Sequence, residues 1–75
     1  MRIRLRYFAV LRERAGCDHE ELELDGTPSA GEVFRGRFPD LSLVVAYARN
    51  GEMCGADAAL SDGDELALLP PLGGG

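Results

Sequence analysis

The chain has 75 residues and a formal net charge of −5 at pH 7, and all of its basic residues are arginine. This negative charge argues against a nucleic-acid partner, because binding to phosphate backbones depends on clustered cations. No apolar run is long enough to span a bilayer and no signal-peptide pattern opens the chain, so we expect one cytoplasmic domain without a membrane partner. Cys17 and Cys54 form no CxxC pair, so free thiols are expected and no metal site is predicted.

The first two predicted strands have complementary charges. Residues 2–7 alternate arginine with apolar residues, which predicts a half-buried strand with its arginines on the solvent side. Residues 20–24 alternate glutamate with leucine, so pairing of the two strands places arginines opposite glutamates. Phe8 breaks the alternation on the arginine side. This aromatic residue is therefore either covered by another element or exposed for a partner.

Two helices are predicted between the strands. Residues 10–15 form a short helix that a glycine ends. The main helix begins either at Thr27-Pro28, with proline in the first turn, or at Ser29, which begins a capping box. Pro39 ends it. An apolar stripe on this helix packs against the sheet, and it consists of Ala30, Val33, Phe34 and Phe38.

The second half of the chain predicts the remaining strands. Residues 44–49 favour a third strand, and Asn50-Gly51 is typical of a type I′ hairpin turn that returns the chain through residues 52–54. Residues 61–64 form an acidic turn, and residues 65–69 are the last strand.

These elements predict an α+β fold of the β-grasp type, with a mixed four- to five-stranded sheet covered by one main helix. The single domain spans residues 1–75 and ends in a flexible tail, residues 72–75. In this arrangement the first and last strands are parallel neighbours, so they end at the same edge of the sheet. Phe8, Met53 and Leu69 are then expected to form an apolar patch at the root of the tail. The alternative, that they are scattered surface residues, is less favoured because all three lie near the tail.

The last residues of the chain are the predicted reactive segment. Pro70 and Pro71 end the strand and favour an extended path. Backbone without side chains can enter a channel that any side chain would block. The reactive group is the carboxylate of Gly75, next to Gly74, and the predicted partner interface comprises Phe8, Met53, Leu69, Pro70, Pro71, Leu72 and Gly73.

The absence of lysine has two explanations. Codon bias in a GC-rich genome is the simpler one. The other is chemical, since a chain with an activated C-terminal acyl group benefits from having no side-chain amine that could capture it.

Four segments carry a family resemblance: residues 6–13 (RYFAVLRE), 48–51 (ARNG), 61–67 (SDGDELA) and 70–75 (PPLGGG). Together they resemble the small sulfur-carrier subunit of molybdopterin synthase, in the ubiquitin-like group of MoaD and ThiS proteins. The last two segments are the most specific, because a GDE turn, a short apolar strand, two prolines and terminal glycines follow one another in order. Gly73, before the usual glycine pair, is the one departure.

The resemblance implies a function in sulfur transfer. An E1-like adenylyltransferase/sulfurtransferase uses ATP to adenylate the Gly75 carboxylate, and a sulfur donor converts it to a thiocarboxylate. The tail then enters the large catalytic subunit of molybdopterin synthase, in a heterotetramer, and gives its sulfur to the pterin precursor of the molybdenum cofactor. The chain itself is thus a non-catalytic co-substrate with no bound cofactor.

Three alternatives stay open. The same chemistry serves carriers for thiamin thiazole, cysteine or thio-siderophore synthesis. A ubiquitin-like modifier would join Gly75 to lysines of other proteins. An inert protein-interaction domain would have a tail without chemistry.

Overall fold

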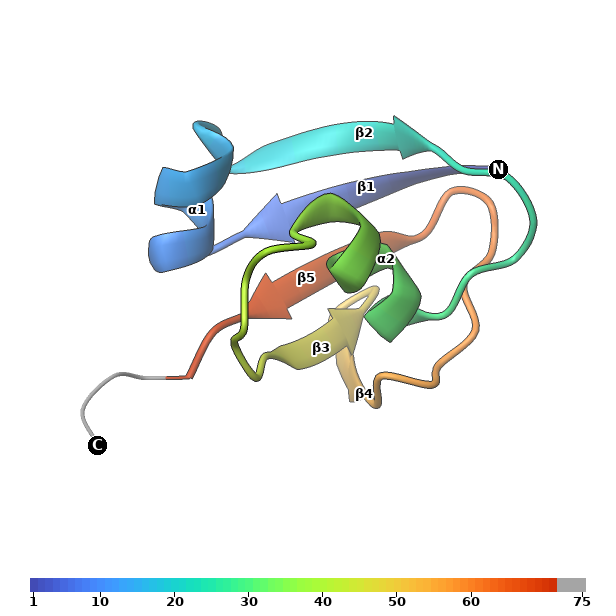
Figure 1. Cartoon of the computed structure of the whole chain (residues 1–75). Coiled ribbons are helices and arrows are strands. Elements are labelled where there is room, and N and C mark those ends of the chain that lie inside the picture. The colour runs from blue at the N-terminus through green and yellow to red at the C-terminus, as the bar shows by residue number, and fades with distance from the viewer. Residues whose placement is uncertain (72–75) are drawn as a thin grey trace.

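The computed structural model describes residues 1–71 and shows a mixed sheet with helix α2 across one face (Figure 1). The strand order is β2-β1-β5-β3-β4, with β1 and β5 parallel and the other neighbours antiparallel. This confirms the predicted α+β, β-grasp fold with five strands. The elements in chain order are β1 (Arg2–Tyr7), α1 (Val10–Ala15), β2 (His19–Glu23), α2 (Ala30–Arg37), β3 (Ala46–Arg49), β4 (Glu52–Cys54) and β5 (Glu65–Leu69).

The hydrophobic core lies between α2 and the inner face of the sheet. Strand β1 alternates exposed arginines with buried apolar residues along its whole length, as its sequence predicts. Leu66 and Leu68 of β5 are fully buried beside it. The predicted stripe of α2 is confirmed, since Phe34 and Phe38 are buried and pack against the rings of Tyr47 and Tyr7.

Helix α2 begins as the capping box at Ser29 predicts, and not at Thr27-Pro28. The Ser29 hydroxyl accepts a hydrogen bond from the Glu32 backbone N–H at 3.3 Å, and the Glu32 carboxylate accepts one from the Ser29 N–H at 2.8 Å. Ser29 itself is extended and bridges to Ala59. Thr27-Pro28 therefore belongs to the incoming loop, because the next residue is still held in strand geometry.

The predicted start of the third strand was wrong by two residues, since β3 begins at Ala46. Val44 lies outside the sheet and is 85% exposed. Ala46 pairs with Leu69, the last residue of β5. Beyond this pair Pro70 has no N–H to donate, so the residues before Ala46 find no backbone hydrogen-bond partner there.

A half-buried cluster of Tyr7, Glu20 and Arg37 joins α2 to the edge of the sheet. The Tyr7 hydroxyl and the Arg37 guanidinium both donate hydrogen bonds to the Glu20 carboxylate. The hydrogen bond from Tyr7, and after it the one from Arg37, hold the pKa of Glu20 below its usual range. Burial, together with the hydrogen bond to Glu20, raises the pKa of Tyr7.

Neutralising Glu20 tests this cluster. Because its folded pKa is depressed, Glu20 contributes stability that is present above its unfolded pKa of about 4.3 and is lost as the pH falls through the folded value. We expect Glu20→Gln to lower the free energy of unfolding at pH 7 by about 1–2 kcal/mol. Urea titrations from neutral to acidic pH should also show a shallower loss of stability in this variant than in the wild type.

Glu21→Gln is the matched control, because Glu21 is exposed on the same strand. It should keep the wild-type pH dependence below the unfolded pKa. Equal behaviour of the two variants would contradict the assignment.

Candidate functional site

The parallel pairing of β1 with β5 brings two chain segments together at one edge of the sheet. Arg6 pairs with Ala67 and Tyr7 with Leu68, so Phe8 follows β1 at the level of Leu69 in β5. Figure 1 shows both strands ending on the same side of the molecule. The described chain leaves the sheet there through Pro70, which is half-buried, and Pro71, which is exposed.

The strand register defines which residues share the helix-free face. Paired residues project to the same face of a sheet. Ala67 lies beside exposed Arg6, Ala48 beside Ala67, and Met53 beside Ala48. Leu69 and Ala46 form the next row, and Arg6 lies over the Phe8 ring at 5.4 Å. We call the resulting surface the outer apolar patch, and its members are Phe8, Ala46, Ala48, Met53, Ala67 and Leu69.

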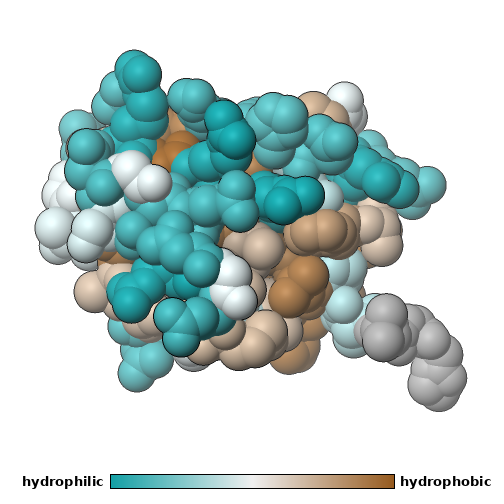
Figure 2. Space-filling model, turned by 180° about the vertical axis from the view of Figure 1, so that it is seen from behind, coloured by the Kyte–Doolittle hydropathy of each residue, from teal (hydrophilic) through white to brown (hydrophobic). Residues whose placement is uncertain are grey.

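The outer apolar patch is open to solvent in the described structure. Met53 is 67% exposed, and Phe8 and Leu69 are half-buried. Figure 2, which views the sheet from the side opposite α2, shows apolar surface gathered over one part of this face and hydrophilic surface over the rest. Contiguous apolar surface of this kind usually marks a protein interface.

Sequence reasoning identified the three large members of the patch but missed two alanines of its floor. Ala46 and Ala48 flank buried Tyr47 on β3, so strand alternation places both on the outer face. Their small side chains make this part of the patch flat. The role of Phe8, Met53 and Leu69 in partner binding stays a prediction, as does that of Pro70 and Pro71.

The predicted reactive segment lies outside the described residues. Its residues are Gly74 and Gly75, and Leu72 and Gly73 of the predicted partner interface lie outside the described residues as well. Within residues 1–71, no group of three histidine, cysteine or carboxylate side chains could hold a metal ion. In the same part of the chain, neither helix has the length and apolar character needed to cross a membrane.

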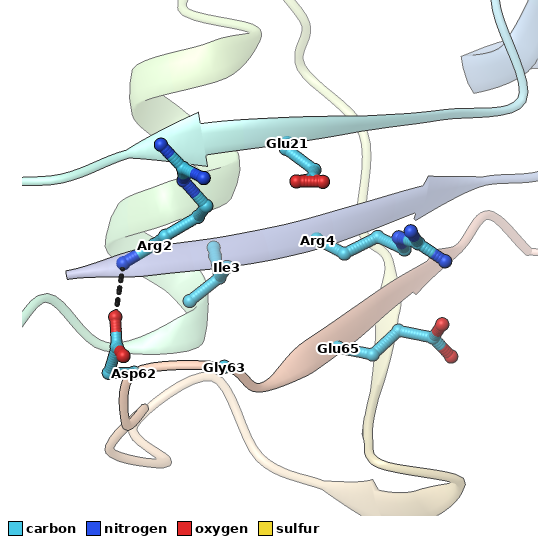
Figure 3. A pocket seen from close by; sticks show the side chains of 7 residues that line it. All are labelled: Arg2, Ile3, Arg4, Glu21, Asp62, Gly63 and Glu65. Atoms are coloured by element: carbon cyan, nitrogen blue, oxygen red, sulfur yellow. Dashed lines mark hydrogen bonds between the residues drawn. The ribbon is translucent and has the colours of Figure 1, made fainter.

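A hollow of about 330 Å³ lies at the other end of β1 from the outer apolar patch (Figure 3). Its lining carries charges of both signs. The register places Arg4 between Glu21 of β2 and Glu65 of β5, and the Arg2 backbone N–H donates to the Asp62 carboxylate at 2.7 Å. With two arginines among three carboxylates, the lining holds little net charge for a ligand, so the outer apolar patch is the better candidate site.

A five-stranded β-grasp sheet with one helix across its inner face defines a ubiquitin-like protein. The chain belongs to the ThiS family, whose model matches residues 5–75. The resemblance identified in the sequence is therefore confirmed.

Named relatives fall into two groups. The chain is 37% identical to the molybdopterin synthase sulfur carrier subunit of Chlamydomonas reinhardtii, with 100% of both chains covered. It is also 34% identical to small archaeal modifier protein 1 of Haloferax volcanii, with 91% of this chain and 94% of the relative covered.

Solved structures show the same two groups. The crystal structure of the Haloferax volcanii modifier matches with a TM-score of 0.77 at 30% identity and full coverage of both chains. A protein–protein complex of subunits 1 and 2 of the molybdopterin-converting factor from Helicobacter pylori contains a chain that matches with a TM-score of 0.65 at 26% identity, again with full coverage.

The turn that positions Phe8 contains a strained residue. The Leu11 backbone N–H donates to the Phe8 carbonyl at 3.1 Å, which closes a β-turn. Ala9, its second residue, has φ 51° and ψ −123°. This is the geometry of position i+1 of a type II′ turn, where glycine is strongly preferred.

We expect Ala9→Gly to raise the free energy of unfolding by about 1 kcal/mol, because relief of strain outweighs the greater freedom of glycine in the unfolded chain. Urea unfolding measures this change. Ala15→Gly, in helix α1, should instead lower the free energy by about 0.5–1 kcal/mol. Destabilisation of equal size in both variants would show that Ala9 is not strained.

Proposed function

We propose that this chain is a sulfur carrier whose C-terminal Gly75 is adenylated, converted to a thiocarboxylate and used as the sulfur source in molybdopterin synthesis. The observation that carries the proposal is the position of the outer apolar patch, at the point where a chain ending in three glycines leaves the sheet. The full-length similarity to a named sulfur carrier subunit supports the choice of pathway.

The chemistry suits a glycine terminus. A carboxylate is a poor electrophile, and adenylation by an E1-like enzyme with ATP supplies a good leaving group. A sulfur donor then displaces AMP, and the thiocarboxylate keeps its sulfur nucleophilic while bound to the carrier. Glycine has no side chain to obstruct the acyl carbon in either step.

The proposal includes docking of the folded body, because a few residues of backbone bind weakly on their own. Ordering a free backbone costs about 1–2 kcal/mol per residue. The outer apolar patch offers the surface to offset this cost, and the proposed partners are the E1-like enzyme and the large catalytic subunit, in a heterotetramer. The Helicobacter pylori complex supports the second partner, because there a similar chain is bound to subunit 2. The carrier contributes no catalytic group and binds no cofactor of its own.

A protein modifier is the second candidate, supported by the 34% identity to the Haloferax volcanii modifier. Such a protein joins its terminal carboxyl group to lysines of its targets. Because this chain has no lysine, copies of it cannot be joined to one another through lysine isopeptide bonds. Carriers of other sulfur pathways and an inert interaction domain remain further alternatives.

Intact-mass analysis of the protein purified from its own host separates these functions. We expect a fraction of the chain to carry a mass increase equal to sulfur replacing one oxygen, and tandem fragmentation should place this change on Gly75. Deletion of Gly74 and Gly75 should abolish the change and the molybdenum cofactor together.

Recovery of Gly75 only in isopeptide bonds with other proteins would instead establish the modifier. An unchanged mass, combined with normal cofactor levels in the deletion strain, would overturn the carrier proposal. If the deletion strain lost another sulfur-containing metabolite and kept normal levels of molybdenum cofactor, the carrier would be assigned to that other pathway.

A further inference from the structure

Strand β2 forms an open edge of the sheet, because β1 is its only neighbour in the described strand order. Tyr7 donates its backbone N–H to the Asp18 carbonyl at 2.8 Å, and Leu24 donates to the Met1 carbonyl at 2.7 Å. The backbone groups of an antiparallel strand alternate in direction, so the even-numbered residues here bond to β1. The N–H and C=O groups that point away from β1 therefore belong to His19, Glu21 and Glu23.

A groove of about 380 Å³ runs between this edge and helix α2. Its apolar floor consists of Leu22, Leu24, Pro28 and Val33, with both leucines half-buried. Gly36 leaves the helix side open, since a Cβ at this position meets no atom within 4 Å. The groove is thus an apolar channel parallel to a row of unpaired backbone groups.

The charges around the groove select the kind of partner. Glu21 and Glu23 project from the outer face of β2, where Glu23 pairs with Arg2 at 2.8 Å, and Asp25 and Glu32 line the groove itself. Arg37 also lines the groove, but its guanidinium already donates to a glutamate of β2. Among the described residues of this edge, the carboxylates of Glu21, Asp25 and Glu32 have no ion-pair partner, so the unpaired charge is negative and attracts a cationic segment.

A second copy of the chain does not fit this edge. Antiparallel pairing of two β2 strands about Glu21 would place the two Glu21 side chains directly opposite each other, and like charges in that position are destabilising. Charged residues on an edge strand commonly prevent such self-pairing. The occupant is therefore a different polypeptide.

We propose that the β2 edge and its groove bind an extended basic segment of a partner protein by strand addition. The pleat of the sheet sets the sequence of this segment. Residues beside Glu21 and Glu23 project to the outer face and are arginine or lysine, whereas the alternate residues project over Leu22 and Leu24 and are aliphatic. The groove lies on the α2 side of the sheet, so the segment and a partner on the outer apolar patch can bind together.

A synthetic peptide tests this proposal without any sulfur chemistry. The probe is acetyl-Gly-Arg-Val-Arg-Val-Arg-Val-Gly-amide, titrated into the ¹⁵N-labelled full chain at physiological ionic strength. We expect saturable chemical-shift changes at the amides of His19, Glu21, Glu23 and Gly36. A peptide with glutamate in place of each arginine should not bind, and a peptide with the three arginines and three valines in separate blocks should bind weakly.

Two variants distinguish strand addition from general attraction of cations. Gly36→Leu fills the groove at a position with free space and should weaken the alternating peptide roughly tenfold, the effect of losing one buried aliphatic contact. Glu21→Arg combined with Glu23→Arg should exchange the preference, so that the glutamate peptide binds and the arginine peptide does not.

Absence of binding, equal affinity for the alternating and block peptides, or equal affinity of the wild type and Gly36→Leu would each overturn the proposal. Because none of these measurements involves Gly75, their failure leaves the proposed sulfur-carrier function untouched. Failure of that function would likewise leave this binding site standing.

Discussion

The parallel pairing of β1 with β5 is the interaction on which the rest of the structure depends. Leu5, Leu66 and Leu68 are completely buried at this seam. Parallel strands side by side must end at the same edge of the sheet, so the turn after β1 and the chain after β5 emerge together. This constraint alone places Phe8 next to the segment that leads towards the C-terminus. An antiparallel arrangement would send the two to opposite ends.

The two faces of the sheet have different roles. The inner face and α2 contribute the core, in which four aromatic rings contact one another. The outer face is divided along the strands. At the start of β1 it carries matched arginines and carboxylates, and at the ends of β1 and β5 it becomes apolar. Since no core contact requires an apolar outer face, binding to a partner is the physical reason that we infer for it.

Sequence periodicity predicted most of the fold, because the local sequence patterns agree with the faces that are buried in the tertiary structure. Alternation located β1 and β5, the Asn50-Gly51 turn located the β3–β4 hairpin, and the stripe of α2 located its buried face. The start of β3 was not predictable from residues 44–49, because it depends on where β5 ends. The floor of the outer apolar patch was missed for a related reason, since Ala46 and Ala48 become a surface only through pairing with β5 and β4.

The most direct test of the account compares sulfur delivery by two variants of the thiocarboxylated chain to the large subunit at limiting concentration. Met53→Glu places a charge in the outer apolar patch without touching the core, and Thr27→Glu places the same charge on an exposed loop elsewhere. We expect Met53→Glu to lower delivery roughly thirtyfold, equivalent to about 2 kcal/mol of docking free energy, and Thr27→Glu to match the wild type. Equal delivery by both variants would contradict the account.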